Sequence, residues 1–460
     1  MDFVSTSPAF KVYTPIVITM NPGRRQQMIA LIQHQRHLQN AHLELLLRRR
    51  RRRRQINKEI RRQPQQRRQR TSWVRPWIQR REELGAYTKL MVELRLEDPK
   101  AFHNFMRMSP AMFDELLARV GPRITKKTTN MRAPLSPGLK LAVTLRHLAT
   151  GAKYEDMKFP WRVPSNSISL ILREVCQAII DEYLDELMTC PTTEEGWREK
   201  SDDWYQKWNF PHTIGAIDGK HVACKAPNKS GSTYHNYKGF FSVILFAMVD
   251  ADYKFMWADV EGVGSCSDAQ LYNMSDLKEG LEAGTISGWP RPDPLPHDTQ
   301  DVPYFIVGDD AFALRPSMMK PYKDTPLERP QRLFNYRLSR ARRVVENAFG
   351  ILANRFQVLL GTMQQTPKTV KLIIRACVLL HNLMRTRYPV LQNRLVDRAE
   401  PNGDIVDGDW RGGRNLEDTE RVVGPNRATR EAKMQRNLLK HWVSSPAGSV
   451  PWQDRMIDTL

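Results

Sequence analysis

Residues 213–219 read TIGAIDG, and residues 304–310 read YFIVGDD. Each stretch is a run of apolar and β-branched residues that ends in an acid, which is typical of a short buried strand followed by a turn. Two further runs of this kind occupy residues 241–249 and 254–260, and helical patterns follow at about 339–360 and 369–384. Strands followed by helices, with crossovers between them, predict an α/β layer fold over residues 206–388.

The strand-end acids and one helical acid form a candidate metal site. Asp218 and Asp309 end their strands, and Glu346 lies in the predicted helix over 339–360. Phosphodiester transfer by two metals needs acids that converge from separate elements, and hard cations such as Mg²⁺ take oxygen ligands. Each acid also has an ordinary explanation, because Asp is a common turn residue and Glu346 can pair with Arg342 on an exposed face. The pattern alone therefore suits several metal-dependent phosphotransferases.

Several blocks of sequence together resemble one known family. They are 216–222 AIDGKHV, 230–232 SGS, 236–240 NYKGF, 249–255 VDADYKF, 264–269 GSCSDA, 307–312 VGDDAF and 334–350 FNYRLSRARRVVENAFG. In this order they resemble consecutive blocks of the PIF/Harbinger transposases, densely over about residues 211–357. The helical stretch from about 95 to 205 is similar more loosely, and the two ends of the chain match little.

The resemblance implies a ribonuclease-H-like fold that carries a DDE triad and uses two Mg²⁺ or Mn²⁺ ions. Asp218 falls on the first-strand Asp, Asp309 on the second Asp and Glu346 on the helical Glu. Asp310 is the alternative second ligand, and the two neighbours cannot both point into the site if the strand extends through them. Asp268 is interpreted as a cap or a loop brace. His221 and Lys220 are expected near the site or facing DNA, and a buried core histidine explains His221 equally well.

The function that the resemblance implies is DNA transposition. A transposase hydrolyses the phosphodiester at the ends of an element and then joins the 3′-hydroxyl to target DNA. The implied partners are double-stranded DNA with terminal inverted repeats, an A/T-rich target, a Myb/SANT-like companion protein and a second copy of the chain, in a homodimer or larger assembly. Two alternatives stay open: a domesticated DDE nuclease that cuts without joining, and a non-catalytic DNA-binding or chromatin adaptor.

Basic residues near the candidate site are expected to hold DNA phosphates. The arginines before Glu346 are Arg329, Arg332, Arg337, Arg340, Arg342 and Arg343. Phosphate contacts of this kind position a duplex without reading its sequence. Lys238, in a polar loop with Tyr234 and Tyr237, is a further candidate that stacking would support. The alternative for the arginines is a solvated charged face, and for the loop an ordinary turn.

Charge is concentrated at the start of the chain. The chain has 71 basic and 50 acidic residues, a net charge of +21, which favours a polyanion as partner. Residues 1–81 hold 20 Lys and Arg against 3 acids, so we expect a largely disordered basic arm there. The arm contains a candidate nuclear import signal, Arg48, Arg49, Arg50, Arg51, Arg52, Arg53 and Arg54. Import, DNA clamping and plain solubility are its three interpretations.

The remaining segments complete the predicted organisation. Residues 82–205 read as an all-helical domain, in which a helix from about Ser165 suggests a helix-turn-helix with Asn166, Ser167 and Arg173 toward DNA. A plain helical subdomain explains the pattern equally well. Residues 389–460 read as a polar tail. Five cysteines without a CxxC pair argue against a zinc finger or disulfide framework, and no apolar run is long enough to cross a membrane. Together with the candidate import signal at residues 48–54, these features lead us to expect a nuclear protein.

Overall fold

The computed structural model describes residues 74–128, 133–323, 326–388, 395–400, 402–419 and 428–458, with a few residues between 41 and 52. The chain divides into two units, Met1–Val74 and Arg75–Leu460. In the first unit, Arg48 lies 3.7 Å from Glu44, one helical turn away. Arg51, Arg53 and Arg54 of the candidate import signal lie outside the described residues.

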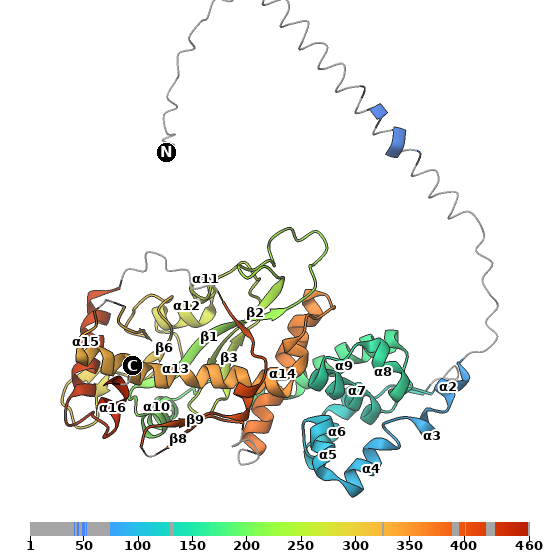
Figure 1. The fold of residues 1–460 in the computed structure, drawn as a ribbon, viewed down its shortest axis with the longest axis horizontal. Helices are drawn as coiled ribbons and strands as arrows, with labels where there is room; N and C mark the ends of the chain where they lie inside the picture. Colours follow the sequence, from blue (N-terminus) through green and yellow to red (C-terminus); the bar gives the residue numbers. More distant parts are fainter. Residues whose placement is uncertain are drawn as a thin grey trace, which may run out of the picture. The chain divides into compact units, whose positions relative to one another are not determined.

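A mixed sheet forms the centre of the second unit. Its strands are β1 (Thr213–Ala223), β2 (Ser242–Val249), β3 (Phe255–Asp259), β6 (Phe305–Val307), β7 (Met318–Met319) and β10 (Glu417–Asp418). Their order is β3-β2-β1-β6-β7, with β10 on β1. β1, β2 and β3 pair antiparallel, whereas β6 and β7 run parallel to β1. This mixed sheet confirms the predicted α/β class with a ribonuclease-H-like core (Figure 1).

Helices cover both faces of the sheet. Ala216, Val222 and Leu245 belong to one core cluster, with the side chains of α13 (Arg329–Arg355) and α14 (Pro367–Arg387). Ile217 and Phe246 belong to a second cluster, with α11 (Asp268–Met274) and α12 (Asp276–Ala283). Because strand side chains alternate, even-numbered positions of β1 face α13 and odd-numbered positions face α11. Asp218 therefore points toward the α13 face.

Helices also form the whole N-terminal part of the second unit. They are α2 (Pro76–Gln79), α3 (Arg81–Leu84), α4 (Leu90–Glu97), α5 (Pro99–Met106), α6 (Pro110–Ile124), α7 (Pro137–Thr150), α8 (Tyr154–Trp161), α9 (Ser165–Leu187) and α10 (Glu194–Trp208). Ser109 and Ser136 cap α6 and α7 by accepting backbone N–H groups. α9 packs along α14, and α10 packs on β1. The helical part is thus joined to the sheet through α9 and α10.

The long helix α13 begins earlier than the sequence pattern predicts. The pattern indicates a start near residue 339, whereas α13 starts at Arg329 and ends at Arg355, where η1 (Gln357–Leu360) follows. Glu328 and Gln331 form a capping box, and Pro330 suits the first turn. This early part contains buried Leu333, Phe334 and Leu338 among arginines and other polar residues, which weakens its helical pattern in the sequence. The apolar side chains expected to seat the helix are buried, namely Val344, Val345, Ala348, Phe349 and Leu352.

The C-terminal segment packs on the core and is not a separate tail over its described residues. It contains β8 (Arg398–Ala399), β9 (Ile405–Val406), η3 (Asp409–Gly412), α15 (Arg430–Ser444) and α16 (Gln453–Asp458). The segments η3, α15 and α16 all contact α13, and Trp410 and Trp442 are buried. A few large side chains carry this packing, and they are too widely spaced in the sequence to produce a recognisable pattern.

Two short strands complete the described secondary structure. β4 (Asp293–Pro294) and β5 (Asp301–Val302) pair antiparallel in the segment that follows α12. Among the described residues, none of the helices has the length and apolar character that a membrane crossing needs.

Candidate active site

Asp218 lies in the middle of the central strand β1, and its side chain is buried. Its Oδ2 atom lies 2.9 Å from Nζ of Lys220, and each side chain is only 9% exposed. The two residues are separated by one position on the strand, so their side chains share the α13 face. Nζ of Lys220 also lies 5.9 Å from the centre of the Phe349 ring on α13. Burial lowers the pKa of Lys220, but the charges of Asp218 and Asp418 raise it more, so the ammonium stays charged.

Asp309 follows β6, the strand that runs parallel to β1. It is 4% exposed, and its Oδ1 accepts the backbone N–H of Ala311 at 2.9 Å, which fixes a tight turn after the strand. The neighbouring Asp310 turns elsewhere, since its Oδ2 pairs with Lys323 at 3.2 Å. The charge of Asp309 acts on the buried carboxyl of Asp268, close to Asp218. This placement favours Asp309 over Asp310 as the second site acid.

Asp268 is the acid whose position sequence reasoning missed. It is the first residue of α11, where a helix cap was expected, but Ser267 and Gln270 form the capping box instead. Asp268 is 3% exposed, and its Oδ1 is buried without a hydrogen-bond partner. Burial raises the pKa of Asp268 to about 8, and the negative charges of Asp218 and Asp309 add to this rise. The block GSCSDA was the available signal.

Glu346 lies on the half-buried side of α13. Phe349 is three residues further along the helix and therefore on the same side, and it contacts Lys220 of β1. The nearby Arg411 has a raised pKa, chiefly because it donates to Asp397 and also because of the charge of Glu346. Glu346 thus lies on the helix face that borders Asp218 of β1, with Arg411 as a charged neighbour.

The acids do not form a finished metal site in this structure. Over the residues that the structure describes, no three His, Cys, Asp or Glu side chains are arranged to hold a metal ion. Their chemistry nevertheless fits a divalent cation. Asp268 has a buried oxygen without a hydrogen-bond partner among the described residues. Burial, and then the charges of Asp218 and Asp309, raise the pKa of its carboxyl, and Lys220 is paired with Asp218. A group of desolvated carboxylates with one ammonium is short of positive charge.

Lys238 and His221 lie beside the same strand. The polar loop around Tyr234 and Tyr237 is organised by buried Asn236, whose Oδ1 accepts the backbone N–H groups of Lys238 and Phe240 at 3.1 Å each. Tyr237 is 50% exposed, and Nζ of Lys238 lies 5.6 Å from its ring centre. His221 is a core histidine, because Nδ1 lies 2.9 Å from Oγ of buried Ser242. Burial and then the charge of Lys238 lower the pKa of His221 to about 4, which keeps its imidazole neutral.

The structure places the expected row of arginines in different surroundings. Arg337 is 1% exposed and donates to the backbone carbonyls of Asn209 and Gly448. Arg340 is also buried and donates to Gly403. Arg329 pairs with Asp454 and Asp458, and Arg332 donates to the last turn of α16. The first four arginines therefore hold the C-terminal segment on α13 and do not form the expected row of phosphate-binding side chains. Only Arg342 and Arg343 remain as half-buried candidates beside Glu346.

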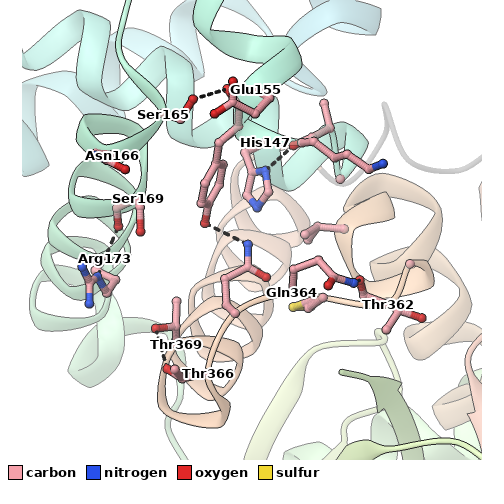
Figure 2. Close-up of a pocket in the computed structure, with 18 residues that line it drawn as sticks. His147, Glu155, Ser165, Asn166, Ser169, Arg173, Thr362, Gln364, Thr366 and Thr369 are labelled. Carbon is pink, nitrogen blue, oxygen red and sulfur yellow. Dashed lines mark hydrogen bonds between the residues drawn. The ribbon is translucent and has the colours of Figure 1, made fainter. Parts of the chain in front are cut away.

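Arg173 lies on an exposed face of α9, next to a cavity of about 660 Å³. Figure 2 shows Asn166, Ser169 and Arg173 along one face of this helix, across from the segment that carries Gln364 and Thr366. Ser167, the other expected DNA contact, is half-buried. The exposed polar face is compatible with the predicted DNA contact of α9, which stays a prediction.

The segment that carries the acids is similar to a known protein family. Residues 217–382 match a family model described as "DDE superfamily endonuclease", a range that includes Asp218, Asp309 and Glu346. This part of the chain is therefore similar to DDE superfamily endonucleases. Endonucleases of this superfamily generally use divalent metal ions, which agrees with the chemistry of the carboxylates. The N-terminal helices and the segment after residue 382 lie outside the matched range.

The chain is also similar to proteins of plants and animals. It is 27% identical over 300 residues to "Protein ALP1-like" of Arabidopsis thaliana, covering 62% of this chain and 71% of that protein. It is 28% identical to "Putative nuclease HARBI1" of Bos taurus and 27% identical to that of Homo sapiens, covering 58% of this chain and 72% of each relative. No solved structure shows significant similarity. These relatives confirm the resemblance to Harbinger-type transposases and nucleases.

Proposed function

We propose that this protein is a DNA transposase that cuts at the ends of an element and joins the freed 3′-hydroxyl to target DNA. The observation that carries the proposal is the position of Asp218 and Asp309. Asp218 lies on β1 and Asp309 follows the adjacent parallel strand β6, and both charges act on the buried carboxyl of Asp268. Glu346 lies on the helix that covers the same face. Acids from three separate elements are the kind of ligand set that metal-assisted phosphodiester chemistry uses.

Each residue of the site has a role in this proposal. Asp218, Asp309 and Glu346 would hold Mg²⁺ or Mn²⁺, two ions per site, which when bound stabilise the attacking and leaving oxygens of the phosphodiester. Lys220 neutralises Asp218 in the protein without metal. Lys238 and the exposed Tyr237 would contact the DNA strand next to the cut. Arg342, Arg343 and the face of α9 around Arg173 would contact phosphates further along the duplex.

The proposal also includes the location of the protein, its partners and its assembly. The arginine run at 48–54 supports nuclear import, and the net charge of +21 supports a nucleic-acid partner. Because two element ends must be held together, we expect at least a homodimer on terminal inverted repeats, with an A/T-rich target. A Myb/SANT-like companion protein would assist recognition of the ends.

The second candidate function is a nuclease that cuts DNA without joining it. The observation that favours it is the printed name of the animal relatives, each called a putative nuclease. A strand-transfer assay separates the candidates, using Mg²⁺, labelled duplexes that carry candidate terminal repeats, and a target plasmid. Joined products that vanish in Asp218→Asn support transposition, whereas cleavage without joining supports the nuclease. DNA binding without chemistry under Mg²⁺ or Mn²⁺ contradicts both enzymes and leaves the non-catalytic adaptor.

A further inference from the structure

The acidic strand β10 lies directly beside the candidate site. It pairs antiparallel with β1, with Asp418 opposite Lys220 and Glu417 opposite His221. Because β6 pairs only with positions 213–216 of β1, the edge near Lys220 is left open, and β10 fills it. The next residue, Thr419, is 4% exposed and hydrogen-bonds the buried carboxyl of Asp268. A segment far along the chain thus covers the strand that carries Asp218.

The contacts of β10 are those that a nucleic-acid backbone makes with a basic surface. Asp418 pairs with Lys220, and Glu417 pairs with Lys238. Tyr237 donates its hydroxyl to the backbone carbonyl of Asp418 at 3.2 Å. Two anionic groups on consecutive residues are therefore held by two ammonium groups and a tyrosine. Lysine ammonium groups bind phosphate oxygens in the same way.

The places that these carboxylates occupy are open to solvent. The side chains of Asp418 and Glu417 are 57% and 55% exposed, although Lys220 beneath them is only 9% exposed. β10 is only two residues long, and the pair of Glu417 with Lys238, whose side chains are 55% and 30% exposed, holds it weakly. A polyanion that approaches from solvent can therefore replace β10 without unfolding the sheet.

We propose that β10 imitates a DNA strand, and that the carboxylates of Asp418 and Glu417 occupy the positions on Lys220 and Lys238 that backbone phosphates take in the substrate complex. The inference rests on the proposed function, because the competing ligand is the DNA that the site would cut. It assigns a phosphate-binding pair, Lys220 and Lys238, next to Asp218. It also makes β10 an autoinhibitory strand that DNA displaces.

The first test compares DNA affinities. The variant Glu417→Gln/Asp418→Asn removes both competing charges, and Glu195→Gln/Glu199→Gln removes two exposed carboxylates from α10 as a control with the same change in net charge. We expect the β10 variant to bind a short duplex roughly fivefold more tightly than the control variant, measured by fluorescence anisotropy at one salt concentration. Equal or weaker binding by the β10 variant overturns the proposal.

The second test follows β10 itself in the wild-type protein. We expect amide hydrogen exchange of residues 415–419 to become faster when saturating DNA is added, because DNA takes the place of the strand. Unchanged or slower exchange of these residues while DNA is bound contradicts the displacement. If the wild-type protein binds no DNA at all, the proposed function fails. If it binds and cuts DNA but neither test responds, only the role of β10 fails.

Discussion

At the scale of single residues, Gly219 shows how closely the site is packed. A Cβ atom at this position would lie 2.0 Å from Oδ1 of Asp268, so the strand carries no side chain between Asp218 and Lys220. Asp268 is buried and cannot easily move away. The absence of a side chain here, more than backbone freedom, is what lets the two acids from β1 and α11 approach each other.

Gly219→Ala is therefore expected to destabilise the protein by about 1–3 kcal/mol through overpacking. The measurement is the free energy of unfolding from urea titration. Gly361→Ala provides the matched control, because a Cβ at Gly361 would meet nothing within 4 Å. Equal stability of the two variants would mean that Asp268 does not lie against β1.

Of the two adjacent acids after β6, we expect Asp309 and not Asp310 to be the metal ligand. Asp309 is buried beside Asp268, whereas Asp310 pairs with Lys323. We expect Asp309→Asn to slow Mg²⁺-dependent DNA cleavage by about 100-fold or more, since a lost metal ligand forfeits several kcal/mol of charge stabilisation. Asp310→Asn should keep cleavage within about threefold of wild type. The reverse ranking of single-turnover rates would transfer the ligand role to Asp310.

At the scale of elements, the C-terminal helix α15 is part of the catalytic core. Trp442 is 3% exposed and donates its indole N–H to Pro296 at 2.9 Å. We expect Trp442→Ala to lower the free energy of unfolding by about 3–5 kcal/mol. Met434→Ala on the same helix, where the side chain is 57% exposed, should change it by about 0.5 kcal/mol or less. Similar chemical denaturation curves for both variants would show α15 to be a dispensable tail.

His381 of helix α14 makes the stability of the folded protein depend on pH. Its Nε2 donates to the Tyr253 carbonyl at 2.8 Å, and burial, followed by the charge of Arg355, lowers its pKa to about 3. The unfolded chain therefore binds this proton more readily than the folded protein, and stability falls as pH drops from about 6.5 to about 3, by up to about 1.4 kcal/mol per pH unit.

Urea unfolding at several pH values tests this dependence on His381. The matched variant is His381→Gln, whose amide can still donate to Tyr253 but carries no titrating group. As the pH falls over this range, the free energy of unfolding of the variant should decrease less than that of the wild-type protein. An identical slope for the two proteins would assign the acid sensitivity to other groups.

Across the whole molecule, the sequence predicts local elements but not the contacts between segments that are distant in the chain. The strands around Asp218 and Asp309 were predictable because apolar runs ending in acids have a local signal. The contacts of Asp268 and β10 with the site were not, since both come from segments distant in sequence that leave no periodic pattern. The buried Arg337 shows the same limit, because a sequence rich in arginine reads as a charged surface until its carbonyl partners are known.

If Asp218, Asp309 and Glu346 together form a metal-dependent DNA-cutting site, single-turnover cleavage of a labelled duplex will depend on all three acids and on the metal. The wild-type protein should cut in Mg²⁺ and stop when the metal is chelated. Asp218→Asn and Glu346→Gln should each be slower by about 100-fold or more while still binding DNA. Undiminished cleavage by either variant, or cleavage that persists in excess chelator, would contradict the account.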